Sequence, residues 1–398
     1  MTAFHRFDPA HCGFPPPRVP PLPPLRAGSL TIKANLLKKG AQWYRRGRYA
    51  LARAYHLAGV GGNGALLAPA YHCRTMLDPA VAVGAKILLY PVTPDLAPDL
   101  GALEILISRS EYLVKALLVP HYFGFAQRIE AMAALCERHG VHLIEDCSHM
   151  LVGAQGMDET APVHGISGHF GVASPYKFFP SPDGGLLWSN AIGLPTSRLR
   201  SPSPVEEMKA IANALAGRVQ RSSAFPSLAH EASVIKTDPE ATPREWIADE
   251  DAPSRLYDVS AEDEGSFVVS RWIATHTDLK RLAARRRENY GRWLATTQGL
   301  PACRPLFAAL PDECVPYMFP LLIDRPNVDF AILKRLGMPI WRWDEMAVSN
   351  CPIASSYRLR LLHLPCHQEL TATEMDWMTS VLIAVCTRPS GDWSVGVH

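Results

Sequence analysis

A lysine enclosed by aromatic residues and prolines is the first residue whose setting could support chemistry. Lys177 lies in the segment SPYKFFPSPDGG, which begins at Ser174 and stands between two apolar runs. Burial lowers the pKa of a lysine, and the neutral amine can then form a Schiff base with a carbonyl group. The pair Gly184-Gly185 would let the backbone pass close to a bulky ligand. Alone, the segment also fits a surface lysine in a turn.

A carboxylate follows an apolar run that is typical of a buried strand. Asp146 comes directly after the run 141–145, VHLIE. A carboxylate at the carboxyl end of such a strand destabilises the fold unless it is paired. The pyridinium nitrogen of pyridoxal phosphate (PLP) would be a suitable partner, because the ion pair keeps the ring protonated and able to accept electrons. A helix cap or a structural hydrogen bond would satisfy Asp146 as well.

Two further groups of residues could bind a ligand. Gly47-Arg48-Tyr49 opens a segment with helical spacing, and N–H groups at a helix N-terminus can bind a phosphate, although Gly47 also fits an ordinary turn. The second group is a set of closely spaced metal-ligand types, Cys136, His139, His142, Cys147 and His149. Because Gly140 separates a helical segment from a strand within this set, the side chains should diverge, and we expect no metal site.

These residues lie within an alternation of strand-like and helix-like segments. The apolar runs that predict strands are 65–68, 86–90, 114–120, 141–145 and 185–188. Helical spacing occurs at 49–58, 75–83 and 129–139. The alternation predicts βαβ units and a mainly parallel sheet of the α/β class, in which ligands bind at the carboxyl ends of the strands.

The remaining segments predict the domain organisation. Residues 1–30 include the proline-rich run PPPRVPPLPPL and should form an extended arm on the protein surface, although such a run can also bind a partner. Residues 31–265 form the expected large domain, with a long acidic loop at about 222–265. Residues 266–398 should hold a long helix and a small α+β domain. The individual elements expected after the large sheet are helices at 204–219, 271–296, 329–336 and 373–384 and a strand at 317–323.

The composition argues against some classes of partner. The 398 residues carry a net charge of +2, which gives no strong field for nucleic acid or an acidic membrane surface. The short run Arg285-Arg286-Arg287 fits a solvated helix face. Nine scattered cysteines and an N-terminus without an apolar signal region indicate reduced thiols and a cytoplasmic protein.

The order of these motifs resembles a known family. Along the chain come Gly47-Arg-Tyr, Pro69-Ala-Tyr, Val83-Gly-Ala-Lys, Pro120-His-Tyr-Phe-Gly, Ile144-Glu-Asp-Cys-Ser-His, Ser174-Pro-Tyr-Lys and Asp183-Gly-Gly. This order is similar to that of the DegT/DnrJ/StrS family of nucleotide-sugar aminotransferases, PLP enzymes of the aspartate-aminotransferase fold (fold type I). The resemblance covers residues 40–190 well and residues 270–385 loosely.

The resemblance implies roles for individual residues. Lys177 would bind the cofactor covalently and then shuttle the substrate proton. Asp146 would pair with the pyridine nitrogen. His149 stands where the family usually has a glutamine near the phenolic oxygen of the cofactor, and a histidine can donate the same hydrogen bond. The remaining contacts would go to the phosphate and come from Gly47, Arg48 and Ser174.

The sequence departs from the family pattern at three places. Cys73 stands where an aromatic residue usually stacks on the cofactor ring, so the stacking either comes from Tyr71 or His72 or is absent. The spacing from Ser174 to Lys177 is shorter than usual. Residues 266–271 replace a Gly-Tyr-Asn motif that reaches the phosphate of the neighbouring subunit, a role open to Arg271. We therefore interpret the sequence as a divergent branch.

The resemblance implies a PLP-dependent aminotransferase that moves an amino group from an amino acid to a ketone. The family default is a keto-sugar nucleotide, in polysaccharide or secondary-metabolite biosynthesis, and no residue here identifies a nucleotide site. A homodimer with shared active sites is also implied. Two alternatives stay open: a PLP-dependent lyase or dehydratase, and a PLP-binding regulatory protein without transaminase activity. Lys177 counts against the dehydratase, because that branch has a histidine in its place.

Overall fold

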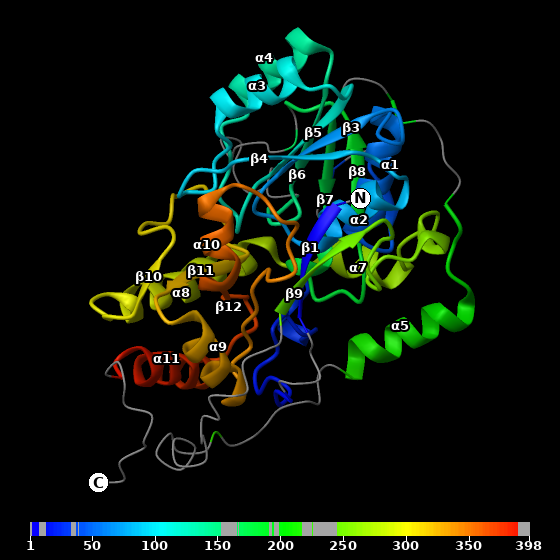
Figure 1. Cartoon of the computed structure of the whole chain (residues 1–398). Coiled ribbons are helices and arrows are strands. Elements are labelled where there is room, and N and C mark those ends of the chain that lie inside the picture. Colours follow the sequence, from blue (N-terminus) through cyan, green and yellow to red (C-terminus); the bar gives the residue numbers. More distant parts are fainter. Residues whose placement is uncertain are drawn as a thin grey trace.

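A seven-stranded sheet forms the centre of the large domain (Figure 1). The structure is a computed structural model that describes residues 2–7, 13–32, 37–38, 40–152, 165, 167–190, 193–194, 199–216, 225 and 245–388. Within these residues the strand order is β2 (Gln42–Tyr44), β8 (Gly185–Ser189), β7 (Phe170–Ala173), β6 (His142–Asp146), β5 (Val114–Pro120), β3 (Ala65–Pro69) and β4 (Ile87–Tyr90). All neighbours from β7 to β4 are parallel, whereas β8 is antiparallel to both of its neighbours.

Both faces of this sheet are buried, which explains its nearly continuous apolar strands. Successive side chains of a strand point to opposite faces. Along β5, Ala116 and Leu118 accordingly belong to one hydrophobic cluster, together with residues of α1 (Gly47–Ala58) and α2 (Arg74–Ala82). Leu117 and Val119 belong to another cluster, together with residues of α3 (Leu100–Arg109) and α4 (Glu130–His139). The parallel sheet expected from the sequence is thus confirmed.

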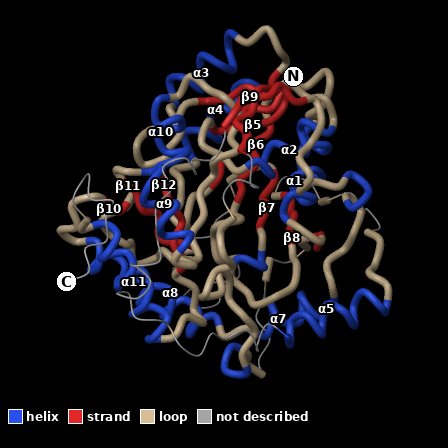
Figure 2. The backbone as a smooth tube through the Cα atoms, turned by 60° about the horizontal axis from the view of Figure 1, so that its bottom comes forward, coloured by secondary structure: helices blue, strands red, loops and turns tan. Residues whose placement is uncertain are grey.

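The C-terminal part forms a smaller α+β unit around a three-stranded antiparallel sheet. Its strands are β10 (Cys303–Pro305), β11 (Met318–Ile323) and β12 (Leu361–Pro365), and its helices are α9 (Pro326–Arg335), α10 (Pro352–Arg360) and α11 (Ala372–Cys386). The long helix α8 (Leu279–Thr297) packs on this unit through Tyr290 and Trp293. Figure 2 shows α8 and α11 together at one end of the molecule, away from α1 and α2. None of the described helices has the length and apolar character that crossing a membrane requires.

Two sequence-based expectations about the elements are wrong. The single helix expected at 271–296 is divided into α7 (Val268–His276) and α8, because Thr277 and Asp278 have extended backbones and the Asp278 side chain caps α8 by accepting a hydrogen bond from the Arg281 N–H. The loop expected at 222–265 contains a strand, β9 (Glu245–Glu250). Most of its earlier part, 222–224 and 226–244, lies outside the described residues. Helix α5 (Pro204–Ala216) is described to residue 216 of the expected 204–219.

The strand β9 is held by the start of the chain. It pairs antiparallel with β1 (Thr2–Phe7), and Phe4 is fully buried in the cluster below α1 and α2. The proline-rich part of the arm also packs on its own chain, since Val19 is buried in the core of the small domain. These contacts show that the arm contributes to the core of its own subunit, beyond the surface position expected from its composition.

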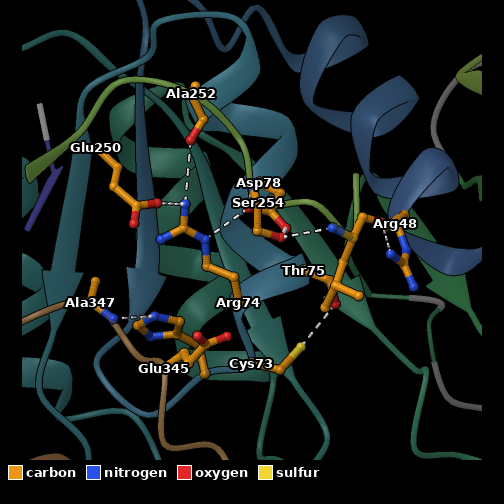
Figure 3. Close-up of polar contacts among 12 residues, drawn as sticks. Arg48, Cys73, Arg74, Thr75, Asp78, Glu250, Ala252, Ser254, Glu345 and Ala347 are labelled. Carbon is orange, nitrogen blue, oxygen red and sulfur yellow. Dashed lines mark hydrogen bonds and ion pairs between the residues drawn. The ribbon is translucent and has the colours of Figure 1, made fainter. Parts of the chain in front are cut away.

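A buried charge cluster joins this two-stranded ribbon to α2 (Figure 3). The Arg74 guanidinium lies 3.4 Å from the centroid of the Phe4 ring and donates a hydrogen bond to Asp78 at 2.9 Å and another to Glu250. Asp78 also accepts hydrogen bonds from the backbone N–H and the hydroxyl of Ser254, at 2.9 and 2.7 Å. Because the side chains of Arg74 and Asp78 are almost fully buried, each depends on the other for its solvation.

This dependence predicts a large loss of stability in the variant Asp78→Ala. Removal of the carboxylate leaves the Arg74 charge buried with one partner fewer, which should lower the free energy of unfolding by about 3–5 kcal/mol. Urea denaturation measures the change. The exposed pair of Arg138 and Glu104, 3.4 Å apart, supplies a control, since Glu104→Ala should cost less than about 1 kcal/mol. Equal losses in the two variants would contradict the role of the buried cluster.

Candidate active site

The first predicted site residue lies at the carboxyl edge of the large sheet. Asp146 ends β6, where it is opposite Pro120 of β5 and Val172 of β7, and its side chain is 2% exposed. One carboxylate oxygen accepts a hydrogen bond from the Ser148 N–H at 2.8 Å. The fold therefore holds a carboxylate out of water at the edge where parallel sheets bind ligands.

Lys177 follows the next strand along the sheet. It ends a single 3-10 turn, Pro175–Lys177, between β7 and β8, and its side chain is half-buried. Its ammonium group lies 5.3 Å from the centroid of the Tyr317 ring. Since Asp146 and Lys177 follow neighbouring strands, β6 and β7, the fold brings both predicted residues to the same edge of the sheet.

A buried arginine from the C-terminal half fixes the lysine turn. Arg286 of α8 donates to the Lys177 carbonyl at 3.0 Å and to the Gln368 side chain at 2.8 Å. It also donates to the carbonyls of Pro316 and Tyr317 at 3.1 and 3.0 Å. Burial lowers the pKa of Arg286 to about 10, so the guanidinium still carries its charge at neutral pH.

The expectation that the run 285–287 forms a solvated face is therefore wrong for Arg286. A signal for its burial existed in the sequence, because Arg286 has helical spacing with other residues of α8 that are buried. These residues are Leu279, Leu282, Ala283, Tyr290 and Trp293.

The start of α1 lies directly against two buried serines. The Ser174 hydroxyl donates to that of Ser148 at 3.0 Å, and both serines are buried. A Cβ atom added to Gly47 would lie 2.1 Å from the Ser174 oxygen, so only glycine lets the helix start approach this hydroxyl so closely. The Arg46 side chain makes no capping hydrogen bond at the helix start. An uncapped helix N-terminus beside two hydroxyls is a setting for a phosphate group.

The other glycines of the predicted site and Arg48 have different surroundings. A Cβ atom on Gly185 would lie 2.3 Å from the Arg46 carbonyl, so this glycine lets β8 approach the start of α1 rather than a ligand. The Arg48 guanidinium donates to the Leu256 carbonyl (Figure 3). Only the backbone N–H of Arg48 is thus left for the phosphate role that its sequence position implies.

The geometry of His149 determines which of its ring nitrogens can act as a donor. Its Nδ1 atom accepts a hydrogen bond from the Phe123 N–H at 3.2 Å, which leaves the proton on Nε2. The imidazole packs on the Tyr317 ring, with the centroids 4.4 Å apart. Burial, followed by the nearby charge of Lys177, holds the pKa of His149 well below its usual value. A neutral imidazole with an Nε2–H donor suits the hydrogen bond expected of this residue.

His72 and Tyr71, the two residues that could replace an aromatic residue at Cys73, make different contacts. Both nitrogens of His72 serve structural bonds, to the Pro69 carbonyl at 2.9 Å and to the Ala347 N–H at 3.1 Å, so the ring is held beside the 347 segment. Tyr71 is fully buried, and its hydroxyl lies 3.0 Å from the His363 Nε2 atom. Its ring lies 4.9 Å from that of Trp343. Of the two residues expected to compensate for Cys73, Tyr71 therefore has the closer link to the aromatic residues of the site.

The proposed metal ligands do not form one cluster. His149 lies in the site just described, whereas Cys136 is buried in the core beside α4. The ligand atoms of His121, Glu145 and Cys147 all lie within 4.8 Å of one another. The Glu145 carboxylate, however, accepts hydrogen bonds from the N–H groups of Gly165, Ser167 and Gly168 and lies 3.2 Å from the His121 ring nitrogen. These bonds give Glu145 a structural task, since they hold Gly165, Ser167 and Gly168 against β6.

Sequence reasoning missed the contribution of the small domain. Tyr317, Trp343 and His363 all lie beside the residues discussed above, yet none of them stands in a recognisable motif. Tyr317 precedes β11 and His363 lies within β12, where each occupies a buried position in an apolar run. Such positions are indistinguishable in sequence from ordinary core residues.

Comparisons with known sequences agree with this geometry. Residues 45–191 match the DegT/DnrJ/EryC1/StrS aminotransferase family. The chain is 28% identical over 155 residues to a pleiotropic regulatory protein of Geobacillus stearothermophilus, over 36% of this chain and 38% of that protein. It is 29% identical over 151 residues to an L-glutamine:2-deoxy-scyllo-inosose aminotransferase of Streptoalloteichus tenebrarius, over 37% of this chain and 34% of that protein. The matches thus span little more than a third of these relatives.

Solved structures share the fold over most of the chain. An aminotransferase of the same family from Brucella abortus covers 87% of this chain and 86% of its own, with 17% identity and a TM-score of 0.57. A Streptococcus pneumoniae protein, solved in its PLP form, covers 93% and 98%, with 14% identity and a TM-score of 0.62. At these identities the likeness concerns the fold. Residues 45–191 are thus similar in sequence to the DegT/DnrJ/EryC1/StrS aminotransferase family, and most of the chain shares the fold of its solved structures.

Proposed function

We propose that this protein is a PLP-dependent aminotransferase that moves an amino group from an amino acid donor to a ketone acceptor. The observation that carries the proposal is the buried carboxylate of Asp146 on β6 at the same edge of the sheet as the lysine that follows β7. The close approach of the uncapped start of α1 to the Ser174 and Ser148 hydroxyls supports a phosphate-bearing cofactor. When bound, PLP supplies an electron sink for the removal of the Cα proton.

Each predicted residue then has a defined task. Asp146 would hold the protonated ring nitrogen, and the first turn of α1 with Ser174 would bind the phosphate. The Nε2–H of His149 would donate to the phenolic oxygen. Lys177 would attach the cofactor and then take and return the proton at Cα, as a general base and acid. Arg286 fixes the backbone of the lysine turn, so that the amine and not the whole loop moves.

The names of the relatives support a proposal for the chemical class of the amino acceptor. Two curated relatives carry names of aminotransferases acting on scyllo-inosose compounds, and another, from Vibrio cholerae, is a GDP-perosamine synthase. We propose a keto-sugar or a similar cyclic ketone, with or without a nucleotide. The name of the Geobacillus relative favours a second candidate, a PLP-binding regulatory protein. A regulator would bind PLP and show no spectral change with amino donors, which separates it from an aminotransferase or a lyase.

The first prediction concerns the attachment of the cofactor. Borohydride treatment of the PLP-loaded protein should fix the cofactor to the peptide that contains Lys177, because only a lysine amine joined to the cofactor carbonyl is reduced to a stable bond. Peptide mass analysis locates the label. The variant Lys177→Ala should lose the label, and Lys86→Ala should keep it. Label on another lysine would refute the assignment.

The second prediction concerns the electron sink. Asp146→Ala should keep the cofactor attached but slow Cα proton removal on the order of a thousandfold or more, because the uncharged ring accepts electrons poorly. Single-turnover absorbance with L-glutamate and L-glutamine measures the rate. Asp95→Ala, in an exposed turn, should retain the rate of the unmodified protein. A near-normal rate in Asp146→Ala would mean that another group holds the ring nitrogen.

We also propose that the protein forms a two-fold homodimer with shared active sites. An exposed apolar stripe on α5 supports this, with Val205, Met208, Ile211 and Leu215 between 40 and 71% exposed. Val268 and Trp272 of the neighbouring α7 are exposed as well. Contiguous apolar surface of this kind marks protein interfaces. Arg271, also on α7, donates to the Ser266 carbonyl of its own chain at 2.9 Å. To reach the phosphate site of the partner subunit, as the dimer proposal requires, it would have to exchange this bond.

The dimer proposal predicts that a charge on this stripe changes the assembly. Sedimentation should give a dimer for the unmodified protein and a monomer for Met208→Asp, because the new carboxylate would lose its hydration at the interface. Ile105→Asp, at an exposed apolar position of α3, should remain dimeric. An unmodified protein that sediments as a fully active monomer would contradict both the dimer and the shared sites.

A further inference from the structure

A hydrogen bond between the two domains crosses the candidate site. Tyr71 follows β3 of the large sheet, and His363 lies in β12 of the small one. The Tyr71 hydroxyl is 3.0 Å from the His363 Nε2 atom, and both side chains are fully buried. The two residues are 292 positions apart in sequence, so their meeting depends on the packing of one domain on the other.

This pair has unused hydrogen-bonding capacity. The Nδ1 atom of His363 is buried and has no hydrogen-bond partner among the residues that the structure describes. If the ring proton is on Nδ1, a buried donor is left over. If it is on Nε2, that N–H donates to the Tyr71 oxygen, and the Nδ1 lone pair and the tyrosine proton remain available. Buried polar atoms without partners destabilise a fold, so one that persists calls for an explanation such as a catalytic role or a bound water or ion.

The surroundings of the pair connect it to Lys177 through a series of ring contacts. The His363 ring lies 4.8 Å from that of Phe123 and 5.1 Å from that of Trp343. The Trp343 ring is 5.8 Å from His149, which in turn packs on Tyr317 beside the lysine. Trp343 itself is half-buried, so this wall reaches the solvent.

The electrostatics leave His363 neutral at physiological pH. Burial lowers the pKa of His363 to about 3, and the positive charge of Lys177 acts in the same direction. Burial also raises the pKa of the Tyr71 hydroxyl well above its usual value. The pair therefore offers neutral donors and acceptors and no charge that could balance a carboxylate. Hydroxyl and keto oxygens are the ligand groups that match it.

We propose that Tyr71 and His363 together bind a hydroxyl group of the amino acceptor, and not its keto group, and so orient the acceptor beside Lys177. This inference rests on the proposed aminotransferase function and narrows its acceptor to a neutral, hydroxyl-bearing cyclic ketone. The aromatic wall would exclude water from around the ring of such a ketone. The hydrogen bonds from Tyr71 and His363 would fix the orientation of that ring. A keto acid would gain nothing from these two residues.

The test compares the two half-reactions in variants that remove one polar group each. Tyr71→Phe removes the hydroxyl, and His363→Leu removes the imidazole. Tyr90→Phe is the matched control, because Tyr90 is equally buried and its hydroxyl donates to a backbone carbonyl, that of Leu118, at 2.8 Å. L-glutamate is the donor probe, and scyllo-inosose and 2-oxoglutarate are the neutral and charged acceptor probes. Rates are followed by cofactor absorbance, and urea denaturation reports the stability of each variant.

The expected result is a selective loss. Tyr71→Phe and His363→Leu should lower kcat/KM for scyllo-inosose by about tenfold to a hundredfold, and mainly through KM, because each removes a hydrogen bond to the acceptor. In His363→Leu, reaction with L-glutamate and with 2-oxoglutarate should change by less than about threefold, and Tyr71→Phe, which keeps the ring but lies in the proposed cofactor site, is judged only by its ratio of the two acceptors. His363→Gln, which keeps a neutral donor and acceptor, should lose less than His363→Leu. Tyr90→Phe should leave the ratio of the two acceptors unchanged.

Other outcomes overturn the inference in distinguishable ways. Equal losses with all three probes, in parallel with a loss of stability, would mean that the pair only holds the domains together. An intact reaction with L-glutamate but none with scyllo-inosose in the unmodified protein would refute the acceptor class and leave the aminotransferase proposal standing. No reaction with L-glutamate or L-glutamine would remove the proposed function and the inference with it.

Discussion

A carboxylate that is buried at the end of a parallel strand constrains everything around it. Asp146 has almost no contact with water, and its cost in free energy must be offset by hydrogen bonds and by a positive partner. The backbone after β6 supplies the first part, since the Ser148 N–H turns back to the carboxylate. The same turn places Ser148 next to Ser174 and the start of α1. The turn that solvates one buried charge thus also brings two hydroxyls to the start of α1.

The second constraint is the position of the lysine turn, and it is met by a residue of another domain. Arg286 binds the Lys177 carbonyl and the carbonyls before β11 with one guanidinium. A buried arginine in this role is specific, because its planar fork reaches several acceptors at fixed angles. Any shift of the small domain against the sheet would strain these bonds. The site is therefore sensitive to the packing of the two domains, even though Asp146 and Lys177 both belong to one of them.

The parts that were predictable from sequence are those with a local cause. The buried strands before Pro69, Pro120 and Asp146 show as apolar runs, and the helix at Gly47 shows as a change of spacing. The break of the long helix at Asp278 also has a local cause, an N-cap residue, but it lies inside a continuous helical pattern that hides it. The strand β9 has no local cause of this kind. Its partner is the start of the chain, so its pairing is decided by Phe4 and Arg74.

The site residues from the small domain were beyond prediction for the same physical reason. A histidine in an apolar strand gives no sign that its ring will meet Tyr71 across a domain boundary. In the proposed cofactor site such a contribution would be needed, because the thiol of Cys73 cannot cover the face of an aromatic cofactor as a ring does. Rings from both domains gather beside this position instead: Tyr71 and His149 from the large domain, and Tyr317 and Trp343 from the small one. The aromatic wall of the site therefore depends on the packing of the small domain against the large one. The site is complete only when the two domains are in contact.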